Sequence, residues 1–394
     1  MNRLIIVGAG PIGLHAALRA TSHGFNVTVL ERAEIGAAVR KWAHVRLFTP
    51  FSMNSTAAGR RIAAASGRLP SDDALLTGEE YLERYLSPLA ASTSLVPNIQ
   101  TFREVIAVSR QAYGKSHAPG KPERSNSPFR LLIRRPDNSE IVMESEVLID
   151  CTGFMTRHRF IGIGGIPCLG ERSCLTAGDY EIAVPQSSPD HLKHAVVVGS
   201  GYSAATSVHL LQDSGWRVSW ITRGDRDVPI PPVPDDRLLE RRTLTQRVNV
   251  LALCSESGVR WLPGVQIESI EQTGNSFSLS VSSVDGWQET LVCDRVIANP
   301  GFRPDSRPFD ELQIHRCYVT EGPIKLAAHL TGETDYDCLA QTAPGPDLLD
   351  NPEPNFYILG AASYGRDSRF LLNNGLEQIE QLFDKMLCPL EATT

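Results

Sequence analysis

The sequence lacks three features that would settle its broad class at once: a long apolar run, a closely spaced cysteine pair and an excess of positive charge. No run of about 18 or more apolar residues occurs among its 394 residues, so no membrane-spanning helix is predicted. The formal net charge is −7, which argues against a nucleic acid or an anionic membrane as the main partner. We therefore expect the partner to be a small molecule.

The cysteines are scattered, and no two of them are separated by only two residues. This spacing encodes neither a local redox dithiol nor a zinc site, and no metal is predicted. Scattered cysteines in a chain of this length are typical of reduced thiols, so we expect a cytoplasmic protein. They are Cys151, Cys168, Cys174, Cys254, Cys293, Cys317, Cys338 and Cys388.

What the sequence does contain is a strand–helix–strand pattern at its start. Residues 4–7 form a β-branched apolar run, residues 14–23 have helical spacing, and residues 26–31 form a second strand that ends in an acid. Between the first strand and the helix stands Gly-x-Gly-x-x-Gly, the order that a dinucleotide-binding loop requires. The unit predicts a Rossmann-type domain.

Each position of this loop has a physical role. Gly8 makes the tight turn, Gly10 lets the backbone approach a pyrophosphate, and Gly13 allows close packing of helix on strand. Glu31 is placed to accept hydrogen bonds from an adenosine ribose. The predicted contacts here are Gly8, Gly10, Pro11, Ile12, Gly13, Glu31 and Arg32.

A second unit of the same kind follows later in the chain, with strands at residues 195–198 and 217–221. Ala204 stands where a third glycine is usual, and Arg223 follows the second strand in place of an acid. An arginine there can pair with the 2′-phosphate of NADPH, so NADPH is favoured over NADH. The predicted contacts are Gly199, Gly201, Tyr202, Ser203, Ala204 and Arg223.

Four further segments accompany the two loops in a characteristic order: 36–42, 146–153, 295–305 and 355–360. With them, the chain resembles the flavoproteins that have two dinucleotide-binding domains. These include thioredoxin-reductase-like enzymes and the flavin-containing and N-hydroxylating monooxygenases. The resemblance covers essentially the whole chain.

The resemblance implies that the N-terminal unit binds FAD and the second unit NADPH. It places Trp42 by the flavin ring, Thr152 and Gly153 where the chain leaves the FAD domain, and Gly360 in a C-terminal flavin-contacting motif. An Asp usually follows that glycine, but Ala361 stands here, so local anchoring of the flavin must differ. Val105 and Asn373 complete the expected FAD contacts.

The expected fold class is α/β. Two Rossmann-like, three-layer dinucleotide-binding domains are predicted, with the NAD(P)H domain inserted in a discontinuous FAD domain. The expected boundaries give an FAD-binding domain at 1–156 and 295–394 and an NADPH-binding domain with its crossover at 157–294. Residues 111–128 are interpreted as an exposed loop, and residues 371–387 as the last helix.

Several reactions are compatible with this fold. Disulfide reduction needs a cysteine pair beside the flavin, and no two cysteines have the spacing of a local redox pair. We favour a monooxygenase that oxygenates a small organic substrate with O₂ through a C4a-(hydro)peroxyflavin, because it needs no protein nucleophile. The absence of Phe-x-Gly-x-x-x-His before the second glycine loop counts against a standard flavin-containing monooxygenase. A reductase, dehydrogenase or oxidase is the alternative, and a redox- or nucleotide-sensing binding protein a remote one.

Candidate catalytic residues are His44, Asn54 and Tyr364. The first two belong to a mixed aromatic and polar segment just past Trp42, and Tyr364 follows the C-terminal motif. Arg366 and Arg369 are interpreted either as a site for an anionic substrate group or as contacts to the last helix or to FAD. A homodimer is compatible with the sequence, which does not identify the substrate.

Overall fold

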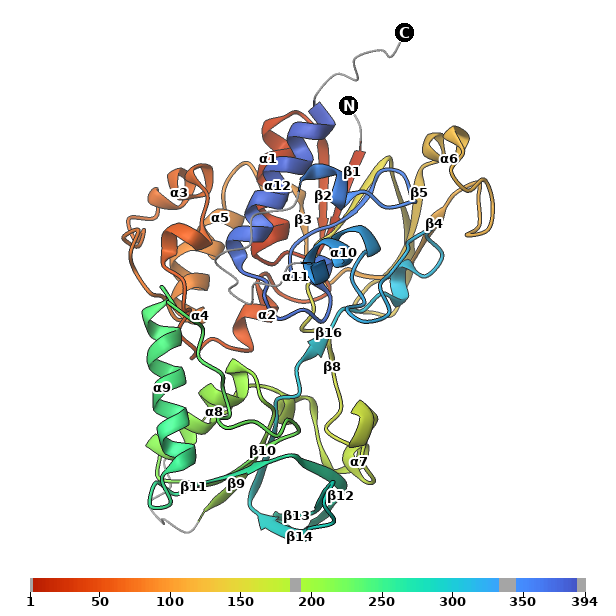
Figure 1. Ribbon diagram of the computed structural model, residues 1–394. Coiled ribbons are helices and arrows are strands. Elements are labelled where there is room, and N and C mark those ends of the chain that lie inside the picture. Colours follow the sequence, from red (N-terminus) through yellow and green to blue (C-terminus); the bar gives the residue numbers. More distant parts are fainter. Residues whose placement is uncertain (1–2, 185–192, 333–344, 388–394) are drawn as a thin grey trace. The chain divides into compact units, whose positions relative to one another are not determined.

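The computed structural model describes residues 3–184, 193–332 and 345–387, and it divides into two compact units (Figure 1). Unit 1 combines Met1–Arg157 with Arg303–Thr394, and unit 2 is His158–Phe302. Of the described helices, none has the length and apolarity that a bilayer crossing requires. Unit 1 is built from two segments of the chain, and unit 2 is the segment between them, as the predicted insertion of one domain into the other requires.

The centre of unit 1 is a parallel five-stranded sheet in the order β17-β7-β1-β2-β3. The side chains of β1 alternate between two apolar layers. Leu4 and Ile6 pack in the core that contains α1 and α12, whereas Ile5 and Val7 pack toward an antiparallel sheet. The strands are β1 (Arg3–Val7), β2 (Asn26–Leu30), β3 (Ile99–Gln100), β7 (Val147–Asp150) and β17 (Phe356–Ile358).

Helices α1 and α12 lie side by side in unit 1 (Figure 1). The antiparallel sheet on the opposite side of the parallel sheet has the order β4-β5-β6, so unit 1 has the three predicted layers. Its strands are β4 (Glu104–Arg110), β5 (Phe129–Arg134) and β6 (Glu140–Ser145). The helices of this unit include α1 (Pro11–Ser22), α2 (Ala37–Arg40), α3 (Ala57–Ala64), α4 (Gly78–Tyr81), α5 (Ser87–Ala90), α6 (Pro122–Asn126), α10 (Ile324–Gly332), α11 (Ala361–Tyr364) and α12 (Leu372–Leu387).

Unit 2 repeats the design with a parallel sheet in the order β11-β10-β9-β15 and an antiparallel sheet in the order β12-β13-β14. One apolar cluster of unit 2 contains side chains of both sheets. The strands are β9 (His194–Val198), β10 (Arg217–Thr222), β11 (Val259–Pro263), β12 (Val265–Thr273), β13 (Ser276–Ser283), β14 (Gln288–Cys293) and β15 (Arg295–Ala298). The helices include α7 (Glu171–Cys174), α8 (Tyr202–Asp213) and α9 (Leu239–Leu253).

The second predicted boundary needs correction. Sequence analysis placed residues 295–302 in the FAD domain, but β15 pairs in parallel with β9 and completes the sheet of unit 2. Val296, Ile297 and Ala298 are fully buried there, so the strand belongs to that core. The chain returns to unit 1 only at Arg303, one residue into β16 (Phe302–Arg303), which pairs with β8 (Arg157–His158).

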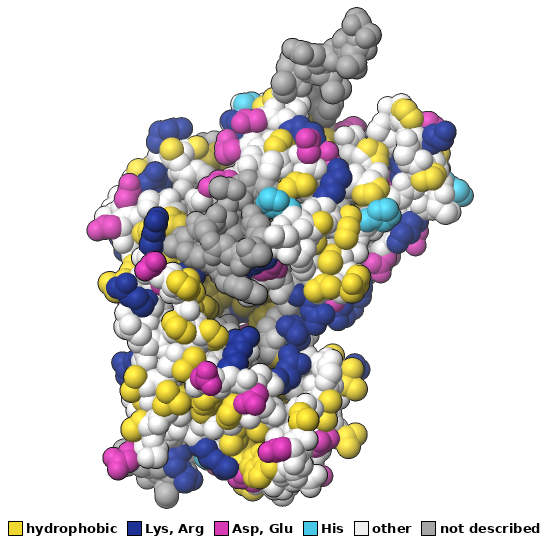
Figure 2. Space-filling view, in the orientation of Figure 1, with side chains coloured by type: hydrophobic (Ala, Val, Ile, Leu, Met, Phe, Trp, Pro, Cys, Tyr) yellow, Lys and Arg dark blue, Asp and Glu magenta, His cyan; other side chains and the backbone are white. Residues whose placement is uncertain are grey.

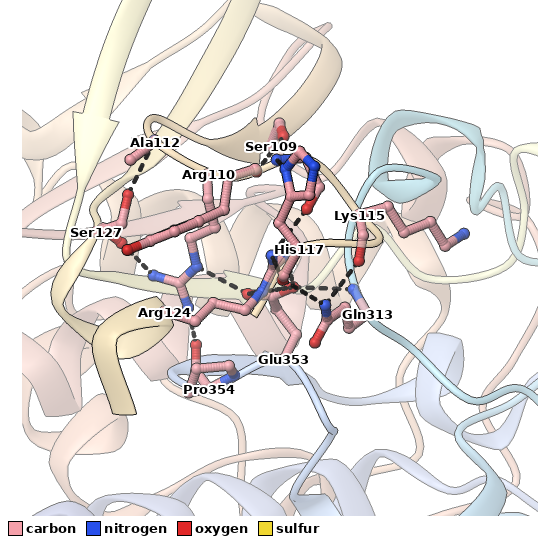
Figure 3. A network of polar contacts seen from close by, with 12 residues as sticks. Ser109, Arg110, Ala112, Lys115, His117, Arg124, Ser127, Gln313, Glu353 and Pro354 are labelled. Atoms are coloured by element: carbon pink, nitrogen blue, oxygen red, sulfur yellow. Dashed lines mark hydrogen bonds and ion pairs between the residues drawn. The ribbon is translucent and has the colours of Figure 1, made fainter. Parts of the chain in front are cut away.

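The loop 111–128 is not simply exposed, as the sequence suggested, because Arg124 within it is fully buried (Figure 3). Glu353 accepts hydrogen bonds from Arg110 Nε at 2.7 Å, from Arg124 Nη2 at 2.7 Å and from the Gln313 backbone N–H at 2.9 Å. Burial alone would raise the pKa of Glu353, but the hydrogen bonds from Arg124, Gln313 and Arg110 lower it. An ionised carboxylate between two guanidinium groups thus fixes this loop to the rest of unit 1.

A second buried network joins α1 to the helical segment 51–90. His15 Nδ1 lies 2.7 Å from the Pro11 carbonyl oxygen, and His15 Nε2 lies 2.8 Å from the Tyr85 hydroxyl, which also accepts from the Thr56 backbone N–H at 3.2 Å. Burial lowers the pKa of His15 to about 4. The ring is therefore neutral, with Nδ1–H donating to Pro11 and Nε2 accepting from Tyr85.

We expect Glu353→Gln to lower the free energy of unfolding by about 3–5 kcal/mol, because two buried guanidinium groups would then face a neutral amide. The measurement is urea unfolding. Glu144→Gln is the matched control, since Glu144 pairs at 4.0 Å with Arg130 and both side chains are partly exposed. That control should change stability by about 1 kcal/mol or less, and equal effects of the two substitutions would contradict the assigned role.

The His15 network predicts a pH dependence of stability. The pKa of His15 is lowered from 6.5 to about 4 on folding. As the pH falls below 6.5, the unfolded chain takes up a proton that the folded chain does not bind until about pH 4. The free energy of unfolding therefore decreases over this window, by up to about 3 kcal/mol. Since other groups titrate too, the quantity to measure is the difference between wild type and His15→Gln, which should shrink toward low pH; a constant difference would refute the assignment.

Candidate functional site

Unit 1 contains a cavity of about 520 Å³ at the carboxyl ends of its parallel strands. Val7, Leu30 and Cys151, at or just past the ends of three strands, contribute to its wall. This edge is where open α/β sheets bind their ligands. Among the predicted FAD contacts, the wall contains Gly8, Gly10, Pro11, Ile12, Glu31, Arg32, Trp42, Val105, Thr152, Gly153 and Gly360.

The glycine loop shows why each glycine is needed. A Cβ on Gly8, whose φ is +106°, would lie 2.6 Å from the Cys151 carbonyl oxygen, and one on Gly13 would lie 1.9 Å from the Gly8 carbonyl oxygen. A Cβ on Gly10 would meet no heavy atom within 4 Å. Packing therefore requires the first and third glycines, and Gly10 leaves room beside the first turn of α1, where backbone N–H groups attract a phosphate.

Glu31 follows β2 and is held by backbone groups. Its Oε2 accepts from the Ala9 N–H at 2.8 Å and its Oε1 from the Ala33 N–H at 2.9 Å. The carboxylate thereby links the glycine loop to the chain after β2, and it also lines the cavity. Together with the space at Gly10, this arrangement fits the ribose and pyrophosphate of a dinucleotide.

The opposite part of the wall carries Trp42 and the C-terminal motif. A Cβ on Gly78 would lie 2.6 Å from Trp42 Cε3, so the indole ring packs directly on a glycine and is fixed in orientation. Gly360 has a φ of +70°, and its N–H donates to Gln378 Oε1 at 2.8 Å. Ala361, which replaces the usual aspartate, also lines the cavity without a polar side chain.

Of the predicted catalytic residues, Asn54 lies at the cavity but its amide is already engaged. Its Nδ2 donates to the carbonyl oxygens of Thr49 at 3.0 Å and Pro50 at 3.1 Å, and its Oδ1 accepts from Thr49 Oγ1 at 2.9 Å. Both amide protons are used, so Asn54 shapes segment 49–55 and offers no donor to a substrate.

His44, Tyr364 and Asn373 do not belong to the cavity wall. Tyr364 is buried, and its hydroxyl accepts from Asn374 Nδ2 at 3.0 Å. Asn373 donates to Glu377 Oε1 at 2.6 Å along α12. Helical periodicity explains the difference for Asn373, because Leu372 begins α12 at the cavity and the next residue points elsewhere.

The wall contains charged residues that sequence analysis did not name: Lys41, Arg103, Glu104 and Asp305. Signals for them were present. Lys41 directly precedes Trp42, Arg103 and Glu104 precede Val105, and Asp305 ends one of the segments that carried the resemblance. Their side chains converge only through tertiary packing, so spacing alone could not rank them.

One described cysteine, Cys151, lines the cavity. It is 7% exposed, and burial, followed by the nearby Asp150 charge, raises its pKa well above the usual value. The six described cysteines are all free thiols, whereas Cys338 and Cys388 lie outside the described residues. Within the described part of the chain, the cavity therefore holds a single, protonated thiol.

Unit 2 has an equivalent loop between β9 and α8. A Cβ on Gly199, whose φ is +139°, would lie 2.2 Å from the Asn299 carbonyl oxygen, and one on Gly201 would meet nothing within 4 Å. Ala204 is fully buried at the position of Gly13. Arg223 follows the end of β10 and is exposed. The geometry of the first loop is thus repeated, with an arginine in place of the acid.

The chain is similar to known oxidoreductases in sequence and in fold. Residues 5–116 match the family model described as pyridine nucleotide-disulphide oxidoreductase. The mercuric reductase of Staphylococcus aureus is 21% identical over 315 residues, which are 77% of this chain and 48% of that protein. The chain thus spans about half the length of this relative.

Two solved structures show the same fold over 98% of the chain. The bacillithiol disulfide reductase of Bacillus cereus has a TM-score of 0.71 at 18% identity, with 98% of its own chain covered. The ornithine hydroxylase of Pseudomonas aeruginosa has a TM-score of 0.62 at 16% identity, also with 98% covered. The resemblance inferred from the sequence motifs is confirmed, and the chain has the two-domain fold of the FAD- and NAD(P)-binding oxidoreductases.

Proposed function

We propose that the protein is an FAD- and NADPH-dependent monooxygenase that inserts an oxygen atom from O₂ into a small organic substrate. The observation that carries the proposal is the cavity of unit 1, which joins a complete dinucleotide loop to a wall whose described residues include one thiol, that of Cys151, held protonated by burial. Redox chemistry there would rest on FAD, because the described residues of the wall offer no cysteine pair.

The residues that would hold FAD are those of the cavity. The N–H groups at the start of α1 would bind the pyrophosphate, Glu31 the adenosine ribose, and Trp42 with Thr152 the flavin end. Lys41, Arg32 and Arg103 add positive charge to a wall that must accept two phosphate groups. When bound, FAD supplies the two-electron and oxygen chemistry that side chains lack.

The thiol observation counts against disulfide reduction. Such an enzyme needs a thiolate to attack the substrate and a second thiol to resolve the mixed disulfide. Cys151 is protonated by burial and has no second cysteine beside it among the described residues of the wall. Similarity in fold to disulfide reductases is therefore not evidence that this cavity reduces disulfides.

The apolar part of the wall supports oxygen transfer. Its side chains come from segments beside Trp42 and beside Thr152, and from the start of α12. Such a wall excludes water, which would otherwise divert the reaction toward release of hydrogen peroxide. These residues are Leu47, Phe48, Phe154, Met155, Phe370 and Leu372.

The choice of NADPH rests on Arg223. β10 ends at Thr222, and the exposed guanidinium of Arg223 follows where an acid would otherwise bind the 2′-hydroxyl of NADH. The guanidinium group of arginine is planar and always charged, so it is suited to binding a phosphate group. The loop at Gly201 has the open space that a pyrophosphate requires.

To test the reaction, the purified protein is loaded with FAD, reduced anaerobically with NADPH and mixed with O₂ in a stopped-flow spectrometer. We expect a transient absorbance band that belongs neither to oxidised nor to reduced flavin, lasting for about a second or longer. Immediate return of the oxidised spectrum, with stoichiometric hydrogen peroxide even when candidate sulfur, nitrogen and carbonyl substrates are supplied, would instead identify a reductase or oxidase.

Arg223→Ala should raise the KM for NADPH by about tenfold and leave the KM for NADH nearly unchanged, because only NADPH loses a charge-assisted hydrogen bond. Steady-state reduction of flavin with each nucleotide measures this. Arg217→Ala is the control, since Arg217 is exposed at the opposite end of the same strand. An equal increase for both nucleotides would show that Arg223 does not read the 2′-phosphate.

A further inference from the structure

A group of arginines in unit 1 has too few acceptors. Glu321 accepts from Arg303 Nε at 2.8 Å and lies 3.5 Å from Arg366 Nη1, and its backbone carbonyl oxygen accepts from Arg316 Nη1 at 3.3 Å. Arg303 and Arg366 thus share one side-chain carboxylate, whereas Arg316 donates to the backbone of Glu321. Burial lowers the pKa of Arg316, and the charges of Asp150, Asp310 and Glu321 raise it. Arg316 Nη2 is buried and has no hydrogen-bond partner within the described residues.

Neighbouring arginines show that this shortage is local. Arg369, which sequence analysis grouped with Arg366, is bound by its own carboxylate, with Nε at 3.0 Å from Asp367 Oδ1 and Nη2 at 2.7 Å from Asp367 Oδ2. Arg307 Nε donates to Asp305 Oδ1 at 2.7 Å. Each of these two guanidinium groups is paired with its own carboxylate, so neither requires a further anion.

The backbone around Glu321 is strained in a way that fixes the carboxylate. Glu321 has a φ of +63°, a conformation that side-chain-bearing residues rarely adopt. It lies in the hairpin 315–324, which packs on α11 so closely that a Cβ on Gly365 would lie 2.0 Å from the Thr320 carbonyl oxygen. Strain of this kind persists where the surroundings impose it, and it gathers at functional sites.

Two of the three arginines, Arg303 and Arg366, are also within reach of solvent. The side chains of Arg303 and Arg366 are 37% and 30% exposed, and that of Glu321 is 19% exposed. Figure 2 shows in dark blue the Lys and Arg side chains that reach the surface on one face, and Arg303 is the last residue of β16. None of the three arginines lines the dinucleotide cavity, so the group is separate from the expected FAD contacts.

We propose that Arg303, Arg316 and Arg366 form an oxyanion-binding site that takes the carboxylate or phosphate group of a small molecule. The ligand would supply the acceptor that Arg316 lacks and would compete with Glu321 for Arg366, whose contact with that carboxylate is the longer one. Guanidinium forks are suited to both kinds of oxyanion. Binding of the anion does not require turnover, so this proposal stands apart from the proposed reaction.

The test uses the full-length, FAD-loaded protein in the Arg223→Ala background, so that the dinucleotide cavity is filled and the arginine of unit 2 is removed. Inorganic phosphate and acetate are titrated separately by calorimetry at constant ionic strength. Saturable binding is expected, and Arg366→Gln should weaken it by about tenfold or more. Preference for phosphate or for acetate identifies which oxyanion the site takes.

Two further variants separate binding from structural damage. Glu321→Gln should strengthen anion binding, because it removes a competing negative charge, and a damaged fold would not give this gain. Arg130→Gln, which alters a half-exposed arginine on β5, should leave binding unchanged. Absence of saturable binding in the parent, unchanged binding in Arg366→Gln, or weaker binding in Glu321→Gln would each overturn the proposal.

Discussion

The close packing of helix α1 against the turn after β1 is the constraint on which the site in unit 1 depends. A Cβ on Gly13 would lie 1.9 Å from the Gly8 carbonyl oxygen, so no other residue allows the helix to start so near the strand. That start brings the helix N-terminus to the sheet edge and leaves the space at Gly10. Glu31 then ties the loop to the next strand through the Ala9 N–H. The proposed phosphate and ribose contacts, and the position of the cavity beside them, depend on this one contact.

Unit 2 satisfies the same constraint with a different residue. Ala204 takes the place of the third glycine, and its side chain is fully buried. The second loop therefore accommodates a methyl group at this position. The two loops thus share a geometry while the residues after the second strand, Glu31 and Arg223, differ in charge. One backbone design can therefore serve two dinucleotides that differ in the chemistry of their ribose.

The sequence predicted the parts of the fold that local physics controls: the strands, the helices and both glycine loops. The insertion of one domain in the other was predicted from the resemblance to two-domain flavoproteins. The sequence did not predict the partners of Arg110 and Arg124, since Glu353 lies 243 and 229 residues away and no pattern links them. It placed the second boundary before β15, because an apolar strand does not reveal which sheet it joins. Asn54 and Tyr364 carry groups suited to catalysis, yet hydrogen bonds with Thr49 and Asn374 occupy them.

The solitary cysteine of the cavity has a consequence for the chemical resilience of the protein. Dithiol active sites are inactivated by mercury and arsenic compounds, which can bind both sulfurs, and by alkylating electrophiles, which the thiolate attacks. Cys151 gives such reagents neither a partner sulfur among the described residues of the wall nor a nucleophilic thiolate. A flavin site built on this wall would continue to work in surroundings where thiol-dependent relatives of the same fold are inactivated.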